Sequence, residues 1–417
     1  MPAKPYEKQT LFWLLMTHLM QEPLFVMYGF ISLILRKHFA MSAWVVALFL
    51  SIKPVLSIFS FYWSSYLTVR PHALRKNFFV AKVLARLLFL LLPCFPYPGF
   101  LLLCSVSYML FYQAAKPAWM EILRSNAQES NTRTAFGWAL TLSYVAGMVL
   151  AVFCGAILDA FSECWSYLFF GSALLGLVNV YFLTNLPIKA QYPNVKSLRW
   201  CWQEQLLRPW LFTKQLMQSR KDFAKFQWGY MLCGAGLMSI QPALQLLMAD
   251  VLQVSYLSFG LAYTSWKGIC IALSSPIWSY LLERFSLFSL SYWVFFLAGL
   301  LPFFLLFSPQ DLRFLYLAYI FYGLAQGGSQ LIWNLSGPHF SQTENSAPYT
   351  AVNVMMVGIR GIFAPFLGAA ITHFTGPFPT LAFGAFLCAL GAVYIFPRKQ
   401  ETQSTYRDHS SNPLENE

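Results

Sequence analysis

Apolar runs of about twenty residues recur along nearly the whole chain, and no other feature restricts its fold so strongly. A helix needs about 20 apolar residues to cross a hydrocarbon layer about 30 Å thick. Of the 417 residues, 58% are hydrophobic and only 11% are charged, whereas about 25% are charged in an ordinary soluble domain. We therefore predict an all-α protein that crosses a membrane many times.

The breaks between the apolar runs divide the chain into twelve predicted transmembrane helices. They cover residues 11–35, 41–67, 78–97, 99–118, 135–158, 164–186, 223–248, 257–282, 286–307, 312–335, 349–374 and 377–396. These spans form two sets of six. We predict an N-terminal half at 1–186, a basic cytoplasmic linker at 187–222, a C-terminal half at 223–397 and a disordered cytoplasmic tail at 398–417.

Lysine and arginine residues concentrate in alternate connections between the spans. The net charge of +12 therefore indicates membrane topology, and we expect no nucleic-acid partner. Because basic residues stay on the cytoplasmic side, this distribution places both termini in the cytoplasm. The compact loops favour a bacterial inner membrane. The N-terminal run shows no small-residue cleavage site, so we interpret it as the first span and not as a signal peptide.

The second and eighth spans repeat one pattern at a constant offset of 214 residues, which is 267 minus 53. Both patterns place a lysine, Lys53 or Lys267, in the middle of a span. The matching positions are Ser51, Lys53, Ser60, Ser65, Tyr66 and Leu67 in the first half, and Ser265, Lys267, Ser274, Ser279, Tyr280 and Leu281 in the second. Such repetition predicts two related six-helix halves, as in many transporters.

This organisation resembles the major facilitator superfamily, and in particular its poorly characterised bacterial members. The family's loop motif between the second and third spans survives in part, because Arg70 matches the motif's arginine while Val69 stands where the family has an acid. The second-half copy keeps Glu283 and Arg284. The resemblance implies a fold of two pseudo-symmetric halves and a conformational role for Arg70, Glu283 and Arg284.

Few ionisable residues lie in the middle of a predicted span, where each costs at least about 2.5 to 3.5 kcal/mol. Three cations, Lys53, Lys267 and Arg360, stand against one acid, Glu22. At least one of these cations therefore lacks an acidic partner from the set, and an anionic substrate group would supply one. The alternative is structural: a cation pairs with Glu22 or donates to helix carbonyls. Glu22, followed by His18, is the candidate for proton coupling, and a permanently paired glutamate fits the sequence equally well.

Other polar residues follow single helix faces at the spacing of an α-helix. In the resembled fold these spans line a central cavity, so we add Gln241, Gln330, Asn334 and Tyr112 to the predicted substrate-binding residues. Packing explains an aromatic stripe such as that of Tyr112 more often than ligand contact does. The third span carries Lys82 and Arg86 near its cytoplasmic end, and we expect both side chains to reach the lipid headgroups.

These observations together predict a secondary active transporter, either a symporter or an antiporter, that works by alternating access on a small anionic or zwitterionic solute. An exporter of hydrophobic compounds, drugs or lipids is the alternative. Motifs of zinc hydrolases, nucleotide-binding loops and serine hydrolases are absent from the sequence, so we expect no enzyme and no cofactor. The eight cysteines show no metal-type spacing. The expected partners are the substrate, protons and membrane lipids, and the expected state is a monomer.

Overall fold

The computed structural model describes residues 5–69, 74–126, 130–184, 202–341 and 347–396. These residues form helices and short connections, and no strand occurs among them. Each of the twelve predicted spans coincides with a helix or with an uninterrupted series of helical segments. The prediction of an all-α membrane protein is therefore confirmed.

The first six spans correspond to five single helices and one helix with a short extension. They are α1 (Pro5–Lys37), α2 (Ala43–Val69), α3 (Leu74–Leu87) extended by the 3-10 turn η2 (Leu88–Leu91), α4 (Pro98–Asn126), α5 (Ser130–Ala160) and α6 (Trp165–Thr184). A second 3-10 turn, η3 (Ser162–Cys164), connects α5 to α6. Proline lies inside α1 and α2, at Pro23 and Pro54, where neighbouring helices in a bundle tolerate it.

The remaining spans begin with α8 (Lys221–Leu246), which ends in the π-helical segment η4 (Leu247–Val251). The next span is built from α9 (Tyr256–Gly260), the π-helical segment η5 (Leu261–Trp266) and α10 (Lys267–Leu282). The last four are α11 (Leu287–Phe307), α12 (Arg313–Ser341), α13 (Ala347–Thr375) and α14 (Pro377–Ile395). The central basic connection also forms a helix, α7 (Trp202–Ser219), although its sequence predicted only a polar linker.

Seven helices in the described part of the chain are long and apolar enough to cross a membrane by length and composition alone. The other predicted spans do not meet this criterion over their described residues. The clearest case is α3, whose 14 residues include four basic side chains. Their positions are Arg75, Lys76, Lys82 and Arg86.

The packing of the helices divides the chain into two compact units. Unit 1 comprises Met1–Arg208 together with Gln245–Ser265, and unit 2 comprises Pro209–Leu244 together with Trp266–Glu417. The segment 245–265 includes η4, α9 and most of η5. It packs in unit 1, whereas the residues directly before and after it in the sequence belong to unit 2. Each unit is described separately below.

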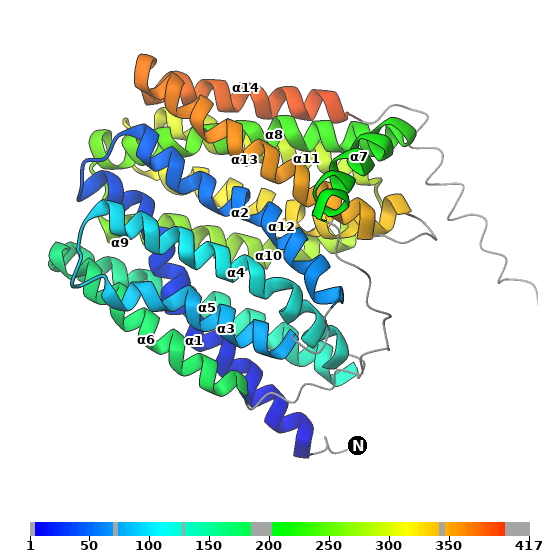
Figure 1. Ribbon diagram of the computed structural model, residues 1–417. Coiled ribbons are helices and arrows are strands. Elements are labelled where there is room, and N and C mark those ends of the chain that lie inside the picture. The colour runs from blue at the N-terminus through cyan, green and yellow to red at the C-terminus, as the bar shows by residue number, and fades with distance from the viewer. Residues whose placement is uncertain (1–4, 70–73, 127–129, 185–201, 342–346, 397–417) are drawn as a thin grey trace, which may run out of the picture. The chain divides into compact units, whose positions relative to one another are not determined.

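Within unit 1, α1 packs against α5 and α6, α3 packs against α4 and α6, and α2 packs against α4 (Figure 1). Aromatic rings fill the space between these helices. Phe89 stacks on Phe169 with ring centroids 5.2 Å apart, and Tyr108 stacks on Tyr112 at 5.6 Å. This interior surrounds the middle of α3.

The segment 245–265 is fastened to α1 and α5 by a group of polar contacts at one end of unit 1. Arg36 forms an ion pair with Asp250, its Nε lying 3.0 Å from both carboxylate oxygens. Lys37 donates from Nζ to the carbonyl of Val254 at 2.9 Å. Asp159 accepts hydrogen bonds from the backbone N–H groups of Tyr256 at 2.7 Å and Leu257 at 2.8 Å, which caps the first turn of α9.

Two glycines allow α5 and α9 to approach each other closely. A Cβ atom at Gly155 of α5 would lie 2.8 Å from the Cα of Leu257, and one at Gly260 would lie 2.8 Å from the carbonyl oxygen of Ala151. Real Cβ atoms do not approach other atoms so closely, so both positions require glycine for the packing of α9 on α5. We name the segment 245–265 the strap.

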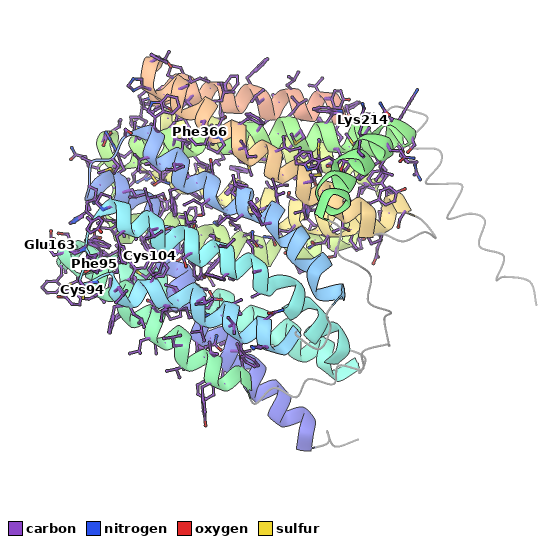
Figure 2. The ribbon with its side chains drawn as sticks, in the orientation of Figure 1. Cys94, Phe95, Cys104, Glu163, Lys214 and Phe366 are labelled. Atoms are coloured by element: carbon purple, nitrogen blue, oxygen red, sulfur yellow. The ribbon has the colours of Figure 1, made fainter. Side chains whose placement is uncertain are left out.

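In the view of Figure 2, the connection of α3 with α4, which carries Cys94 and Phe95, and the connection of α5 with α6, which carries Glu163, appear at the same end of unit 1. His38, which follows α1, also lies here, with Nε2 3.9 Å from a carboxylate oxygen of Glu163. Three connections predicted to share one side of the membrane therefore meet at one end of the unit.

Unit 2 has a more uniformly apolar interior. In it α11 packs against α12 and α14, and α10 packs against α12. Phe223, Phe226, Phe295 and Phe340 form the centre of its core together with apolar residues from every helix of the unit. Leu216 anchors α7 in this core, whereas Lys214 of α7 is exposed (Figure 2). Small residues bring helices close together: a Cβ atom at Gly236 would lie 2.6 Å from the carbonyl oxygen of Gly384.

Candidate functional site

Two basic side chains of α3 lie deep inside unit 1. Lys82 is 8% exposed and Arg86 is 4% exposed, and they are the only buried charged side chains among the described residues. The expectation that they reach the headgroups is therefore wrong. The reason is the orientation of α3. Lys82 and Arg86 are four residues apart and therefore share one side of the helix. That side is buried in the unit, and Val80, Val83 and Leu87 on another side are exposed.

Lys82 reaches α1 and α4. Its Nζ lies 3.2 Å from Oε1 of Gln21, to which it donates, and 5.9 Å from the centre of the Tyr112 ring. It also lies 5.5 Å from the ring of Phe78, one turn earlier on its own helix. Both ring distances are within the range of cation–π attraction. One polar acceptor and two aromatic faces therefore surround this ammonium group.

Arg86 lies against α6. It donates from Nη1 to the carbonyl of Lys82 at 2.6 Å, and its guanidinium occupies the space that a side chain at Gly176 would need. Its Nε is buried and has no hydrogen-bond partner. Buried donors in proteins normally have a partner, so this atom is an exception that calls for an explanation.

The acid of unit 1, Glu22, lies between α1 and α5. A Cβ atom at Gly147 of α5 would lie 3.3 Å from Oε2 of Glu22, so glycine leaves room for the carboxylate. The hydroxyl of Ser143 lies beside this carboxylate. Glu22 forms no ion pair with a lysine, arginine or histidine side chain that the structure describes.

Two tyrosines of α4 lie within electrostatic range of both the acid and Arg86. Tyr108 and Tyr112 stack with an interplanar angle of 21°, and Tyr28 of α1 packs on Tyr108 at a centroid distance of 5.2 Å. Both α4 tyrosines interact electrostatically with Glu22 and also with Arg86. The arrangement across unit 1 is thus a carboxylate, an aromatic pair and two cations, and we name these five residues (Glu22, Lys82, Arg86, Tyr108 and Tyr112) the unit 1 cluster.

Lys53 of α2 has a different environment. Its side chain is exposed, the phenol of Tyr263 in the strap lies within electrostatic range of it, and its backbone carbonyl accepts from Nε2 of Gln113 at 3.4 Å. Lysine ammonium groups are poorly tolerated against lipid tails. An exposed ammonium in the middle of a transmembrane helix therefore requires water or a polar ligand.

In unit 2, Arg360 lies in the contact between α13 and α8. It donates from Nη1 to the backbone carbonyl of Tyr230, and its guanidinium fills the space beside Gly234. This is the contact with a helix carbonyl that the sequence leaves open as the structural alternative. Lys267 begins α10 with its side chain half-buried, and its backbone packs against Gly323 of α12.

A chain of hydrogen bonds between neutral side chains crosses unit 2. Gln227 of α8 donates to Asn353 of α13, which donates in turn to Ser336 of α12 at 2.8 Å. None of these three residues belongs to the predicted substrate-binding set. The polar residues predicted to bind substrate lie elsewhere: Gln241 donates within its own helix to the carbonyl of Leu237, and Gln330 and Asn334 are exposed on α12.

Of the residues predicted to act in the conformational loop, Glu283 and Arg284 are exposed at the end of α10, and the Arg284 guanidinium lies 4.3 Å from the Tyr280 ring. Arg70 and the side chain of His18 lie outside the described residues. Within unit 1 the structure brings Glu22 and Tyr112 together and adds Lys82, Arg86 and Tyr108 to them. The exposed apolar stripe on the opposite face of α3 is the sequence signal that locates Lys82 and Arg86.

The fold is shared with solved transporter structures. A variant of the nucleoside transporter NupG superimposes with a TM-score of 0.71 at 14% sequence identity, covering 93% of this chain and 100% of that one. A POT family transporter in complex with 5-aminolevulinic acid gives a TM-score of 0.68 at 13% identity, covering 92% and 94% of the two chains. A bacterial homologue of the human lysosomal transporter Spinster gives 0.64 at 12% identity, covering 97% and 99%.

The sequence itself agrees with the fold. The model of the Major Facilitator Superfamily matches residues 228–414, in the second half of the chain. No curated protein matches the sequence. The helices of the described residues, the shared fold and the match over residues 228–414 together show an integral membrane protein that has the fold of these transporters and whose second half is similar to the Major Facilitator Superfamily.

Proposed function

We propose that the protein is a secondary active transporter that carries a small organic anion or zwitterion by alternating access. One observation carries this proposal, namely the excess of cations over acids within the spans of unit 1. Among the described side chains in the middle of these spans, Lys53, Lys82 and Arg86 stand against Glu22. A negatively charged substrate group would compensate the excess.

The energetic argument concerns burial. A charge removed from water without a counter-charge costs several kcal/mol, and helix carbonyls offset only part of that cost. Neither Lys82 nor Arg86 lies within 4.0 Å of a carboxylate oxygen in the described part of the chain. A buried charge without a partner lowers stability, and such a charge persists where function requires it. In a transporter, that function would be recognition of the substrate.

The structure changes the weight of the individual candidates. Arg360 contacts a backbone carbonyl of α8, so we assign it to the packing of unit 2 and move the emphasis of the proposal to Lys53, Lys82 and Arg86. Lys267, Gln241, Gln330 and Asn334 remain candidates for the substrate contacts of unit 2. Tyr112 remains a candidate in unit 1, where it lies beside Lys82.

The similar structures support a small polar solute. They include a nucleoside transporter and POT family transporters in complex with a thioalcohol-conjugated peptide and with 5-aminolevulinic acid. We propose a substrate of comparable size. We further propose that Glu22, with His18, couples transport to protons, that both termini are cytoplasmic, and that a monomer in a bacterial inner membrane is the working form.

Export of hydrophobic compounds, drugs or lipids is the second candidate function. The aromatic interior of unit 1 favours it, because Tyr28, Phe89, Tyr108 and Tyr112 form a nearly continuous series of ring contacts. Aromatic side chains provide large apolar contact areas. The excess of cations has no role in such an exporter, so this function is the weaker candidate.

Uptake into proteoliposomes distinguishes the two functions. Purified protein is reconstituted and supplied with radiolabelled anions, zwitterions and neutral hydrophobic dyes, with and without a pH gradient, alongside Lys53→Ala and Lys214→Ala. We expect uptake of a charged solute that Lys53→Ala abolishes and Lys214→Ala leaves intact. Transport of dyes alone, unaffected by Lys53→Ala, would assign the protein to the exporter class.

A further inference from the structure

The opposite charges inside unit 1 do not neutralise one another. Glu22 forms no ion pair with a described cation, and neither Lys82 nor Arg86 forms one with a described acid. A charged pair that served only to hold helices together would be in direct contact, because direct contact is what offsets the desolvation cost. Here both signs of charge are present in one compact unit, and neither forms an ion pair with a charged side chain that the structure describes.

The two tyrosines of the cluster lie near charges of both signs. Tyr112 interacts electrostatically with Glu22 and with Arg86, and its ring lies 5.9 Å from the Lys82 ammonium. Tyr108 behaves in the same way and stacks on Tyr112. A ligand that satisfies both ends of this arrangement must carry a negative group and a positive group separated by a short spacer.

We propose that the unit 1 cluster is the binding site for a zwitterionic solute. Its carboxylate or phosphate binds Lys82, with Arg86 contributing positive charge from the adjacent turn, its ammonium group binds Glu22, and its spacer lies against Tyr112. Gln21, which accepts from Lys82 in the structure, orients the ammonium of Lys82. This inference rests on the proposed function and narrows its substrate class from anion or zwitterion to zwitterion.

The unsatisfied polar atoms of the unit agree with this assignment. The Nε of Arg86 and the hydroxyl of Tyr28 are buried without a hydrogen-bond partner among the described residues. These atoms belong to α3 and α1, two of the helices that carry the cluster. A polar ligand supplies partners to groups that the protein leaves incomplete, and an apolar ligand does not.

The test uses the whole protein in detergent or nanodiscs and measures the shift in melting temperature on adding ligand. The probes are unbranched ω-amino acids from glycine to 6-aminohexanoate, with alkyl carboxylates and alkylamines of the same lengths as controls. A ligand that binds the folded state raises the melting temperature according to its affinity. We expect stabilisation by amino acids of one preferred length, and none by the carboxylates or amines alone.

Variants assign the two ends. Lys82→Met and Glu22→Gln remove one charge each with little change in size, Lys82→Arg keeps the charge, and Lys214→Met on α7 is the matched control. Removing one partner of a buried charge contact costs about 2 to 5 kcal/mol, or at least about thirtyfold in affinity. We expect that loss for Lys82→Met and Glu22→Gln with the preferred amino acid, near-normal binding for Lys82→Arg, and unchanged binding for Lys214→Met.

The outcomes separate this inference from the proposed function. If proteoliposomes transport a carboxylate that lacks an amine and Lys82→Met transports it normally, the zwitterion site is refuted while the transport of anions stands. If no charged solute is bound or transported by the wild-type protein, both proposals fail. Equal binding of the preferred amino acid by Lys82→Met and wild type would also overturn the inference, because the ammonium would then make no contact with the ligand.

Discussion

Two arginines inside the spans, one in each unit, make their described hydrogen bonds in different ways. In unit 2, Arg360 donates across a helix contact to the carbonyl of Tyr230, beside a glycine that leaves it room. In unit 1, Arg86 makes its described hydrogen bond within its own helix. The Nε atoms of both arginines are buried without a described partner, so the difference is that the first hydrogen bond joins two helices and the second does not. Residue type therefore does not reveal the role of an intramembrane cation, and its hydrogen-bond partners do.

The largest expected effect concerns unit 1 and tests whether its basic residues bind the substrate. Lys82→Met should lower the rate of substrate uptake by at least about thirtyfold, because a buried charge contact to the substrate is lost at a cost of about 2 to 5 kcal/mol. Initial rates in proteoliposomes measure this, with Lys214→Met as control. Normal uptake by Lys82→Met would place this lysine with the structural residues and remove the contrast between the units.

The next largest effect concerns unit 2. Arg360→Met should destabilise the ligand-free protein by about 1.5 to 3 kcal/mol, because it removes a hydrogen bond from a charged donor to the carbonyl of Tyr230. The melting temperature in detergent measures the change. Arg86→Met is the matched variant in unit 1 and should not be destabilised to that extent. Equal losses in both variants would show that the two arginines serve the same structural purpose.

The hydrogen bonds among Gln227, Asn353 and Ser336 extend the comparison of the two units. They stabilise the interior of unit 2 without any charged side chain. Asn353→Leu should cost about 1 to 3 kcal/mol, since it leaves Gln227 and Ser336 buried without their described partner. Thermal unfolding measures the loss, and uptake per folded molecule should stay near normal. A variant that folds well and transports poorly would move Asn353 into the substrate pathway.

The smallest effects are expected at the strap, which gives unit 1 polar contacts at its end. Asp159→Ala should cost about 0.5 to 2 kcal/mol, as for the loss of a helix cap, because its carboxylate accepts from Tyr256 and Leu257. Asp250→Asn should cost about 0.2 to 1 kcal/mol, as for an exposed ion pair. Asp159→Ala should therefore have a lower melting temperature than Asp250→Asn. The reverse order would mean that the Arg36 ion pair holds the strap more firmly than the cap does.

Much of the fold follows from the sequence, because each span must be long and apolar enough to cross a membrane. The same rule does not predict α7, which forms in a polar connection, or the strap, whose attachment to α1 and α5 depends on tertiary contacts of Asp159 and Asp250. The sequence correctly restricts attention to a few mid-span charges. The sequence does not reveal that Arg360 donates to a helix carbonyl, because this partner is a backbone atom 130 residues away and leaves no pattern in the sequence.

The misplacement of Lys82 and Arg86 has a physical explanation. Proximity to a predicted span end suggests that a long side chain reaches the headgroups, but the direction of a side chain depends on the helix face. On α3 the apolar residues Val80, Val83 and Leu87 are exposed, which leaves the basic face toward α4 and α6. Comparing both faces of the helix, and not its ends alone, would have placed the two cations inside.

The melting temperature of ligand-free Lys82→Met, compared with wild type, tests the central claim most directly and requires no knowledge of the substrate. If Lys82 is a buried cation kept for a ligand, replacing it with an apolar side chain of similar length removes an uncompensated charge. We therefore predict a melting temperature equal to or above that of the wild type. A decrease as large as that of Arg360→Met would contradict the account and show that Lys82 holds unit 1 together.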